Sequence, residues 1–131
     1  MLGLTHWPWW RRWFGSRSER AAAAFLRRAG YRIVVHNYRS PQGEIDLIAT
    51  DGPCIVFVEV RSTAGVDIQR IAESIDREKQ RRISAAARHF MHRFRLGDRP
   101  ARFDVMLVQW RPEFKTPQVR HIKAAFETVE F

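Results

Sequence analysis

The chain has 131 residues, an apolar share of 45% and one cysteine, Cys54. These values fit a single globular domain and exclude a disordered chain or a disulfide-stapled fold. The formal net charge of +9 and the pI of about 11.1 favour an anionic partner, nucleic acid first and an anionic membrane surface second. Because nothing in the sequence asks for an oxidising compartment, we expect the protein in the cytoplasm.

The first fifteen residues are rich in tryptophan and arginine, with four tryptophans in the first 13 positions. The apolar run is too short and too interrupted for a signal peptide. Tryptophan and arginine suit a membrane–water boundary, but they would equally stack on bases or pack on the domain, and a mobile tail explains the composition too. We therefore predict a tail, 1–15, and one domain, 16–131, and membrane contact by the tail is the less favoured expectation.

Residues 16–29 are predicted to form the first helix. Ser16 and Glu19 have the spacing of a capping box, in which each side chain accepts a hydrogen bond from the other residue's main-chain N–H. Apolar residues then recur at helical spacing, and Gly30 ends the segment. Glu19 therefore has a structural explanation besides any functional one.

A first strand is predicted over residues 31–38, with Ile33 and Val35 on one face. A turn at 41–43 leads from it into the segment around which the chain is organised. There, two apolar alternating runs, 43–49 and 55–61, flank an aspartate-glycine pair, and this pattern is a strong signal for a β-hairpin.

Alternation within this hairpin gives each strand a polar position on a shared face. One register places Asp46 beside Glu59, with Arg61 about 7 Å further along at roughly 3.3 Å per residue. Two half-buried carboxylates repel each other and need a cation or a proton, which a hard divalent cation such as magnesium would supply. The polar side of a half-exposed antiparallel hairpin would show the same alternation, so the pattern alone leaves both interpretations open. Glu44 shares this predicted face and is a reserve ligand.

The longest helix is predicted over residues 76–95, with an apolar stripe that ends at Phe94. From Arg77 to Arg95 the segment carries seven basic residues against one acid, Glu78. A solvated charged face is the ordinary explanation, but this one-sidedness favours contact with phosphates. The candidate nucleic-acid-binding residues are Lys79, Arg77, Arg81, Arg82, Arg88 and Arg95.

A fourth strand is predicted over 102–110, a short edge strand over 119–122 and a terminal turn over 123–127. The order is helix, three strands, helix, two strands. We therefore predict an α/β fold with a mixed sheet of four to five strands flanked by helices. His36, His89, His92 and His121 lack ligand spacing, and we expect surface roles for them.

Three separated segments now resemble one known family: GEIDLI at 43–48, FVEVR at 57–61 and RFDV at 102–105. Together with the first-helix pattern and Lys79, they are similar to the signature of the bacterial YraN family of predicted endonucleases. The resemblance covers roughly residues 15–127. That family is similar to archaeal Holliday junction resolvases and is placed in the PD-(D/E)XK nuclease superfamily, which implies a restriction-endonuclease-like core.

The resemblance also implies roles for individual residues. Asp46 and Glu59 would hold Mg²⁺ or Mn²⁺, Glu19 would be a supporting acid, and Arg61 would stand at the superfamily's lysine position. An arginine holds a phosphate or a water but cannot act as a general base in a protein. Asp104 is expected to be a fold residue paired with a neighbouring arginine.

The expected activity is metal-dependent cleavage of DNA, with branched or recombining DNA as one substrate class. The alternative is a nucleic-acid-binding module that kept the fold and lost turnover. A third hypothesis is that the tail binds a membrane surface or a protein partner. A homodimer is a further expectation, because cutting both strands of a duplex needs two sites.

Overall fold

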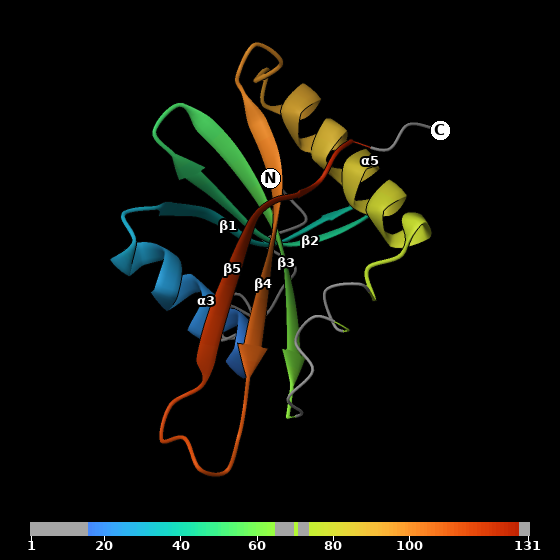
Figure 1. Ribbon diagram of the computed structural model, residues 1–131. Helices are drawn as coiled ribbons and strands as arrows, with labels where there is room; N and C mark the ends of the chain where they lie inside the picture. Colours follow the sequence, from blue (N-terminus) through green and yellow to red (C-terminus); the bar gives the residue numbers. More distant parts are fainter. Residues whose placement is uncertain (1–15, 65–69, 71–73, 129–131) are drawn as a thin grey trace.

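The computed structural model of the protein describes residues 16–64, 70 and 74–128 (Figure 1). The predicted tail, 1–15, therefore lies outside the described residues. The elements follow the predicted order and confirm the α/β class: α3 (Arg17–Arg28), β1 (Arg32–Ser40), β2 (Gly43–Asp51), β3 (Cys54–Thr63), α5 (Arg77–Arg93), β4 (Ala101–Gln109) and β5 (Gln118–Phe126). No helix in the described part of the chain is long and apolar enough to cross a membrane.

The five strands lie in the sheet in their chain order, β1-β2-β3-β4-β5. Neighbouring strands are antiparallel except β3 and β4, which are parallel. A parallel pair cannot be joined by a tight turn, so the chain must cross over, and α5 lies in this connection. The sheet is therefore mixed, as predicted, with β1 and β5 at its edges.

β5 is longer than the predicted edge strand. The expected turn at 123–127 is wrong, because the strand continues to Phe126. It does so through an irregularity in the register opposite Phe103 and Val105, where Ala124 has a positive φ of 50°. The main-chain N–H of Ala124 donates to the Asp104 carboxylate at 2.9 Å. This bond gives the N–H a partner at the point where the irregularity interrupts the hydrogen bonds between the strands.

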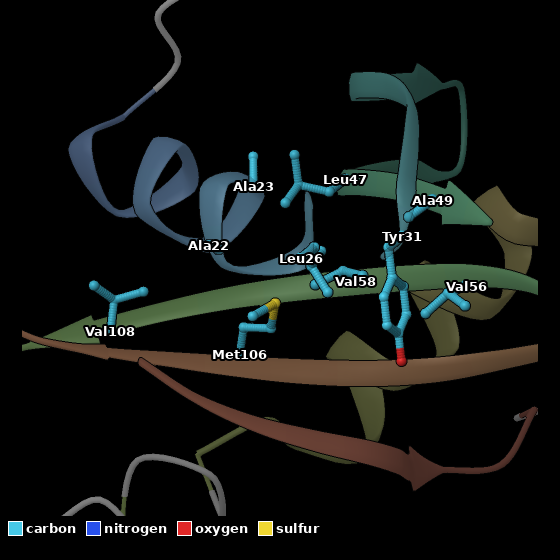
Figure 2. Close-up of a cluster of buried hydrophobic side chains, with 10 residues drawn as sticks. All are labelled: Ala22, Ala23, Leu26, Tyr31, Leu47, Ala49, Val56, Val58, Met106 and Val108. Atoms are coloured by element: carbon cyan, nitrogen blue, oxygen red, sulfur yellow. The ribbon is translucent and has the colours of Figure 1, made fainter. Parts of the chain in front are cut away.

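The capping box at the start of α3 is confirmed. The Glu19 N–H donates to Ser16 Oγ at 3.0 Å, and the Ser16 N–H donates to Glu19 Oε1 at 2.9 Å. The helix then packs its alanines and Leu26 against one face of the sheet (Figure 2). That cluster consists of Ala22, Ala23, Leu26, Tyr31, Leu47, Ala49, Val56, Val58, Met106 and Val108.

α5 covers the opposite face of the sheet, so the molecule has three layers (Figure 1). Ile83 and Phe90 pack there with Phe57, the strand residue that alternates with Val56 and Val58. Phe94 does not complete the predicted stripe, because the residue is 40% exposed. The helix ends before it, and Arg95 lies beyond the helix with a φ of 55°, the left-handed conformation that commonly terminates helices.

One prediction for β1 is wrong. Ile33 packs in the cluster under α3, whereas Val35 packs in the cluster under α5. The register explains this, because Ile33 pairs with Ala49 and Val35 with Ile48, with a bulge between them. An inserted residue reverses the alternation, so residues two apart point to opposite faces.

Candidate functional site

The hairpin of β2 and β3 opens into a fork at the end away from its turn. Asp51 pairs with Cys54 around the central residues Gly52 and Pro53, and the pairing ends at Leu47 and Val58. Beyond that point β2 stays paired with β1 and β3 stays paired with β4. The next residues in register are Asp46 and Glu59, so both candidate ligands lie where the strands separate.

Asp46 fills this fork. Its Oδ2 accepts a hydrogen bond of 2.8 Å from the Val60 N–H, which replaces a main-chain bond of the ladder. Burial, followed by the negative charge of Glu59, raises the pKa of Asp46 to about 7. The two side chains are also close enough for a hydrogen bond, which requires a proton on one of them. Proximity of these two carboxyls is therefore a feature of the fold.

Alternation also fails at Asp46. Ile45 and Ile48 both pack under α5, although they are three residues apart. Asn37, which is opposite Asp46 in the register of β1 and β2, has a positive φ of 54°. Both strands are therefore distorted locally at Asp46, and strict alternation of side chains did not predict this distortion.

Glu59 is almost fully enclosed, with a side chain that is 6% exposed. Two cations approach its Oε2 atom, Arg61 Nε at 3.6 Å and Lys79 Nζ at 3.6 Å. The sequence placed Lys79 among the basic residues of the long helix and in the resemblance to the YraN family, but it did not predict the contact with Glu59. Its position beside Glu59 depends on how α5 docks on the sheet, and no local pattern carries that information.

Glu19 joins the pair from the start of α3. Burial raises its pKa, the hydrogen bond from the Ser16 N–H opposes this, and the charge of Asp46 raises the pKa further. Glu19 is therefore both the capping residue of α3 and a neighbour of Asp46. The position of Glu19 is therefore compatible both with capping α3 and with the supporting role beside Asp46 that the resemblance implies.

A divalent metal fits the chemistry of these donors. Within the described ranges, no group of three or more His, Cys, Asp or Glu side chains could hold a metal ion, so the candidate ligands are the two carboxylates of Asp46 and Glu59. Mg²⁺ is commonly bound by one or two carboxylates, with water and substrate phosphates as its other ligands. The pKa of Asp46 is raised first by burial and then by the negative charge of Glu59, and a bound cation would counter both effects.

Two acidic residues lie outside this site. Glu44 does not serve as a reserve ligand, because it pairs with Arg39 at 3.1 Å on an exposed part of β2. Asp104 is a fold residue, as expected: it is fully buried and paired with Arg102 Nε at 3.0 Å. It also accepts a hydrogen bond from His121 Nε2 at 2.7 Å.

The expectation of surface roles is wrong for two histidines. The His121 side chain is 7% exposed and is bonded to Asp104, and His89 Nδ1 lies 2.6 Å from the buried Tyr38 hydroxyl. Their partners are 17 and 51 residues away in the sequence, so spacing could not reveal them. His36 is partly buried, and burial followed by the charge of Arg27 lowers its pKa.

The basic residues of α5 predicted to contact phosphate differ in their surroundings. Arg81 and Arg82 both pair with Glu78, at 3.0 and 3.4 Å. Arg77 and Arg88 are exposed, and Arg95 follows the helix. The helix thus combines Lys79, which faces the carboxylates, with arginines that face solvent.

Comparisons with known proteins show which family the chain belongs to. A family model described as "Uncharacterised protein family UPF0102" matches residues 18–108. The chain belongs to the UPF0102 family. The matched region contains the capping glutamate of α3, the whole β2–β3 hairpin and α5.

Similar UPF0102 proteins come from several bacteria. One from Syntrophus aciditrophicus is 43% identical over 113 residues, which cover 86% of this chain and 87% of the relative. One from Moorella thermoacetica is 40% identical over 116 residues, covering 88% and 97%. One from Geotalea uraniireducens is 41% identical over 113 residues, covering 86% and 88%.

Proposed function

We propose that this UPF0102 protein is a metal-dependent endonuclease that hydrolyses phosphodiester bonds of DNA, with Mg²⁺ or Mn²⁺ held by Asp46 and Glu59. The observation that carries the proposal is the pair of neighbouring carboxyls, Asp46 and Glu59, at the fork of β2 and β3, with Arg61 and Lys79 beside Glu59. The resemblance of three segments to the YraN family, and through it to the PD-(D/E)XK superfamily, supports the same activity.

Each residue of the pair has a defined task in this proposal. A bound divalent cation would lower the pKa of a water and offset the charge that develops on the phosphate. The Val60 N–H holds Asp46 in position for this role, and the side chains of Arg61 and Lys79 hold Glu59. Glu19 supports Asp46 from α3, and its capping bonds fix its position.

Arg61 is suited to hold the scissile phosphate. Its Nε atom is buried and has no hydrogen-bond partner among the residues that the structure describes, since 3.6 Å to Glu59 is too long for one. A buried donor without an acceptor costs about 1–3 kcal/mol. A phosphate oxygen would satisfy it, and the guanidinium, whose side chain is 33% exposed, is accessible to a ligand.

A nucleic-acid-binding module without turnover is the second candidate. One observation favours it: Glu59 Oε2 already has two cationic neighbours, which lowers its need for a metal ion. Arg61 also cannot give up a proton. Under this alternative the arginines of α5 would bind DNA, and the acidic pair would only position Arg61 and Lys79.

The deciding experiment is a cleavage assay on junction, flap, single-stranded and duplex DNA with Mg²⁺ or Mn²⁺. We expect Asp46→Asn and Glu59→Gln to reduce cleavage at least about 100-fold, the order lost when one electrostatic contact to a transition state is removed. Glu44→Gln is the matched control, because Glu44 is an exposed carboxylate on the same strand and should leave cleavage unchanged.

Other outcomes separate the candidates. Cleavage that persists in both Asp46→Asn and Glu59→Gln would exclude this site as the source of the activity. Salt-sensitive DNA binding without cleavage in any metal would favour the binding module. Cleavage that appears only in Arg61→Lys would show that the basic residue alone limits turnover.

A further inference from the structure

A cavity lies where the turn between β1 and β2 meets α5. It has a volume of about 250 Å³ and lies beside the middle of the helix. Gln42 lines it from the turn, and Ala85, Arg88 and His89 line it from α5. The sequence predicted Arg88 as a nucleic-acid-binding residue of the long helix, but no motif and no family match assigns a role to the cavity itself.

The walls of the cavity are held in place on both sides by hydrogen bonds and close packing. On the turn, Ser40 Oγ accepts hydrogen bonds of 3.2 Å from the N–H groups of Gln42 and Gly43. Gly43 in turn lies against the main chain of Arg82 on α5. On the helix, His89 Nδ1 is bonded to the hydroxyl of the buried Tyr38. These contacts hold the main chain of the turn and the ring of His89 in place beside the cavity.

The functional groups around the cavity are mostly hydrogen-bond donors. Arg88 carries a guanidinium, and Gln42 carries an amide N–H₂. When the Tyr38 hydroxyl donates to His89 Nδ1, the proton of a neutral ring is on Nε2, and a charged ring has an N–H there as well. Among the described lining residues none is acidic. Because these groups donate hydrogen bonds and one of them is positively charged, the cavity favours an anionic ligand.

The size of the cavity narrows the choice of ligand. Pockets for drug-sized molecules span about 300–1,000 Å³. A cavity of about 250 Å³ suits a small group such as one phosphate with its ordered waters. The three donor types match phosphate oxygens, which accept hydrogen bonds from arginine, amide and imidazole groups.

We infer that the cavity lined by Gln42, Arg88 and His89 binds a backbone phosphate of nucleic acid at a distance from the cleavage site. Arg88 follows Lys79 by nine residues on one helix, which corresponds to about 14 Å at 1.5 Å per residue. That length is roughly four nucleotide steps at 3.4 Å along a strand. The assignment to nucleic acid rests on the proposed function, whereas the anion site itself does not.

The experiment tests the anion site and the nucleic acid separately, on the full chain and without divalent metal. Inorganic phosphate is first titrated while the ¹⁵N and ¹H signals of the histidine side chains are followed by NMR. We expect saturable shifts of the His89 signals in the parent protein and in Arg120→Gln, and loss of these shifts in Arg88→Gln. Arg120 is the matched control because it is an exposed arginine on the edge strand β5.

The salt dependence of duplex DNA binding is then measured for the same three proteins. One phosphate contact contributes about 0.9 to the slope of log Kobs against log salt concentration, so Arg88→Gln should reduce the slope by about one and Arg120→Gln should not. Gln42→Ala, a change on an exposed turn, should weaken phosphate binding without removing charge.

Two results would overturn the inference. His89 signals that do not respond to phosphate would remove the anion site. A phosphate response with equal salt slopes in Arg88→Gln and Arg120→Gln would show that the cavity does not hold nucleic-acid phosphate. Both readouts are independent of cleavage, so a failure of the endonuclease proposal is seen in the cleavage assay alone.

Discussion

Gly43 lies so close to Arg82 that no side chain fits at its position. A Cβ on Gly43 would stand 2.8 Å from the Arg82 carbonyl oxygen and 3.2 Å from the Arg82 Cβ. This contact joins the start of β2 to α5. Asp46 follows on the same strand and Lys79 precedes on the same helix, so the contact helps to fix the two sides of the acidic site relative to each other.

We therefore predict that Gly43→Ala destabilises the protein by about 1–3 kcal/mol, the usual cost of overpacking a closely packed contact. Urea denaturation measures this change. Gly97→Ala is the matched control, because a methyl group on Gly97 would meet no atom within 4 Å and its φ is not positive. A loss of stability in Gly97→Ala equal to that in Gly43→Ala would contradict the steric explanation.

A second prediction follows from the pKa of Asp46, which is raised to about 7. Between about pH 4 and pH 7 the folded protein holds a proton that the unfolded chain releases, so stability falls as pH rises through this window. The loss is at most about 4 kcal/mol, at 1.36 kcal/mol per pKa unit. Asp46→Asn lacks the titrating group and keeps an acceptor for the Val60 N–H.

Urea denaturation in EDTA at several pH values checks this prediction. We expect Asp46→Asn to be more stable than the parent at pH 8 and similar to it below pH 4. Glu44→Gln should follow the parent at every pH, since Glu44 is exposed and paired with Arg39. Parallel pH profiles for Asp46→Asn and the parent would show that Asp46 is not the group responsible.

The two roles of Glu19 are separable by substitution. Glutamine also serves in a capping box, so Glu19→Gln should keep the stability within about 0.5 kcal/mol, whereas Glu19→Ala should lose about 1 kcal/mol. Both variants should bind Mn²⁺ about tenfold more weakly if Glu19 supports Asp46, the lower end of the loss for a supporting group. Calorimetric titration measures the affinity, and unchanged affinity in Glu19→Gln would leave Glu19 as a capping residue only.

Asp104 holds the β4–β5 side of the sheet together. It is fully buried and accepts bonds from Arg102, His121 and the Ala124 N–H. Burial alone would raise its pKa, but these donors outweigh burial and the pKa is lowered. We predict that Asp104→Asn costs about 3–5 kcal/mol at pH 7, because it leaves buried partners without their charge.

The sign of the pKa shift gives Asp104→Asn a pH dependence as well. The stabilisation by Asp104 is present above its unfolded pKa of about 4 and is lost as pH falls through the lower folded value. The difference between the parent and Asp104→Asn should therefore shrink below about pH 4. Glu113→Gln, which removes an exposed pair with Arg111, should change stability by less than about 1 kcal/mol.

The local features of this fold could be predicted from the sequence, because their signals are local. The capping box of α3 and the hairpin around Gly52 each depend on a few adjacent residues. The pairing of Asp46 with Glu59 also followed from hairpin register, although the distortion opposite Asn37 did not. The bulge after Ile33 carries no glycine or proline signal, so alternation gave the wrong face for Val35.

The remaining features depend on docking between distant segments. The approach of Lys79 to Glu59 and the bond between His121 and Asp104 join residues 20 and 17 positions apart, across the packing of α5 and β5. Neither periodicity nor motif spacing contains this information. Residue type alone suggested a basic face for Lys79 and the surface for His121.

The chain order of the strands has a consequence for how the protein folds. Both carboxylates belong to one hairpin with a two-residue loop, whose closure is fast and carries little entropic cost. The lysine arrives only after a much longer loop closes, when the parallel pairing of β3 with β4 forms. We expect the two carboxylates to be brought together early, when this hairpin closes, and Lys79 to reach Glu59 only when α5 docks on the sheet.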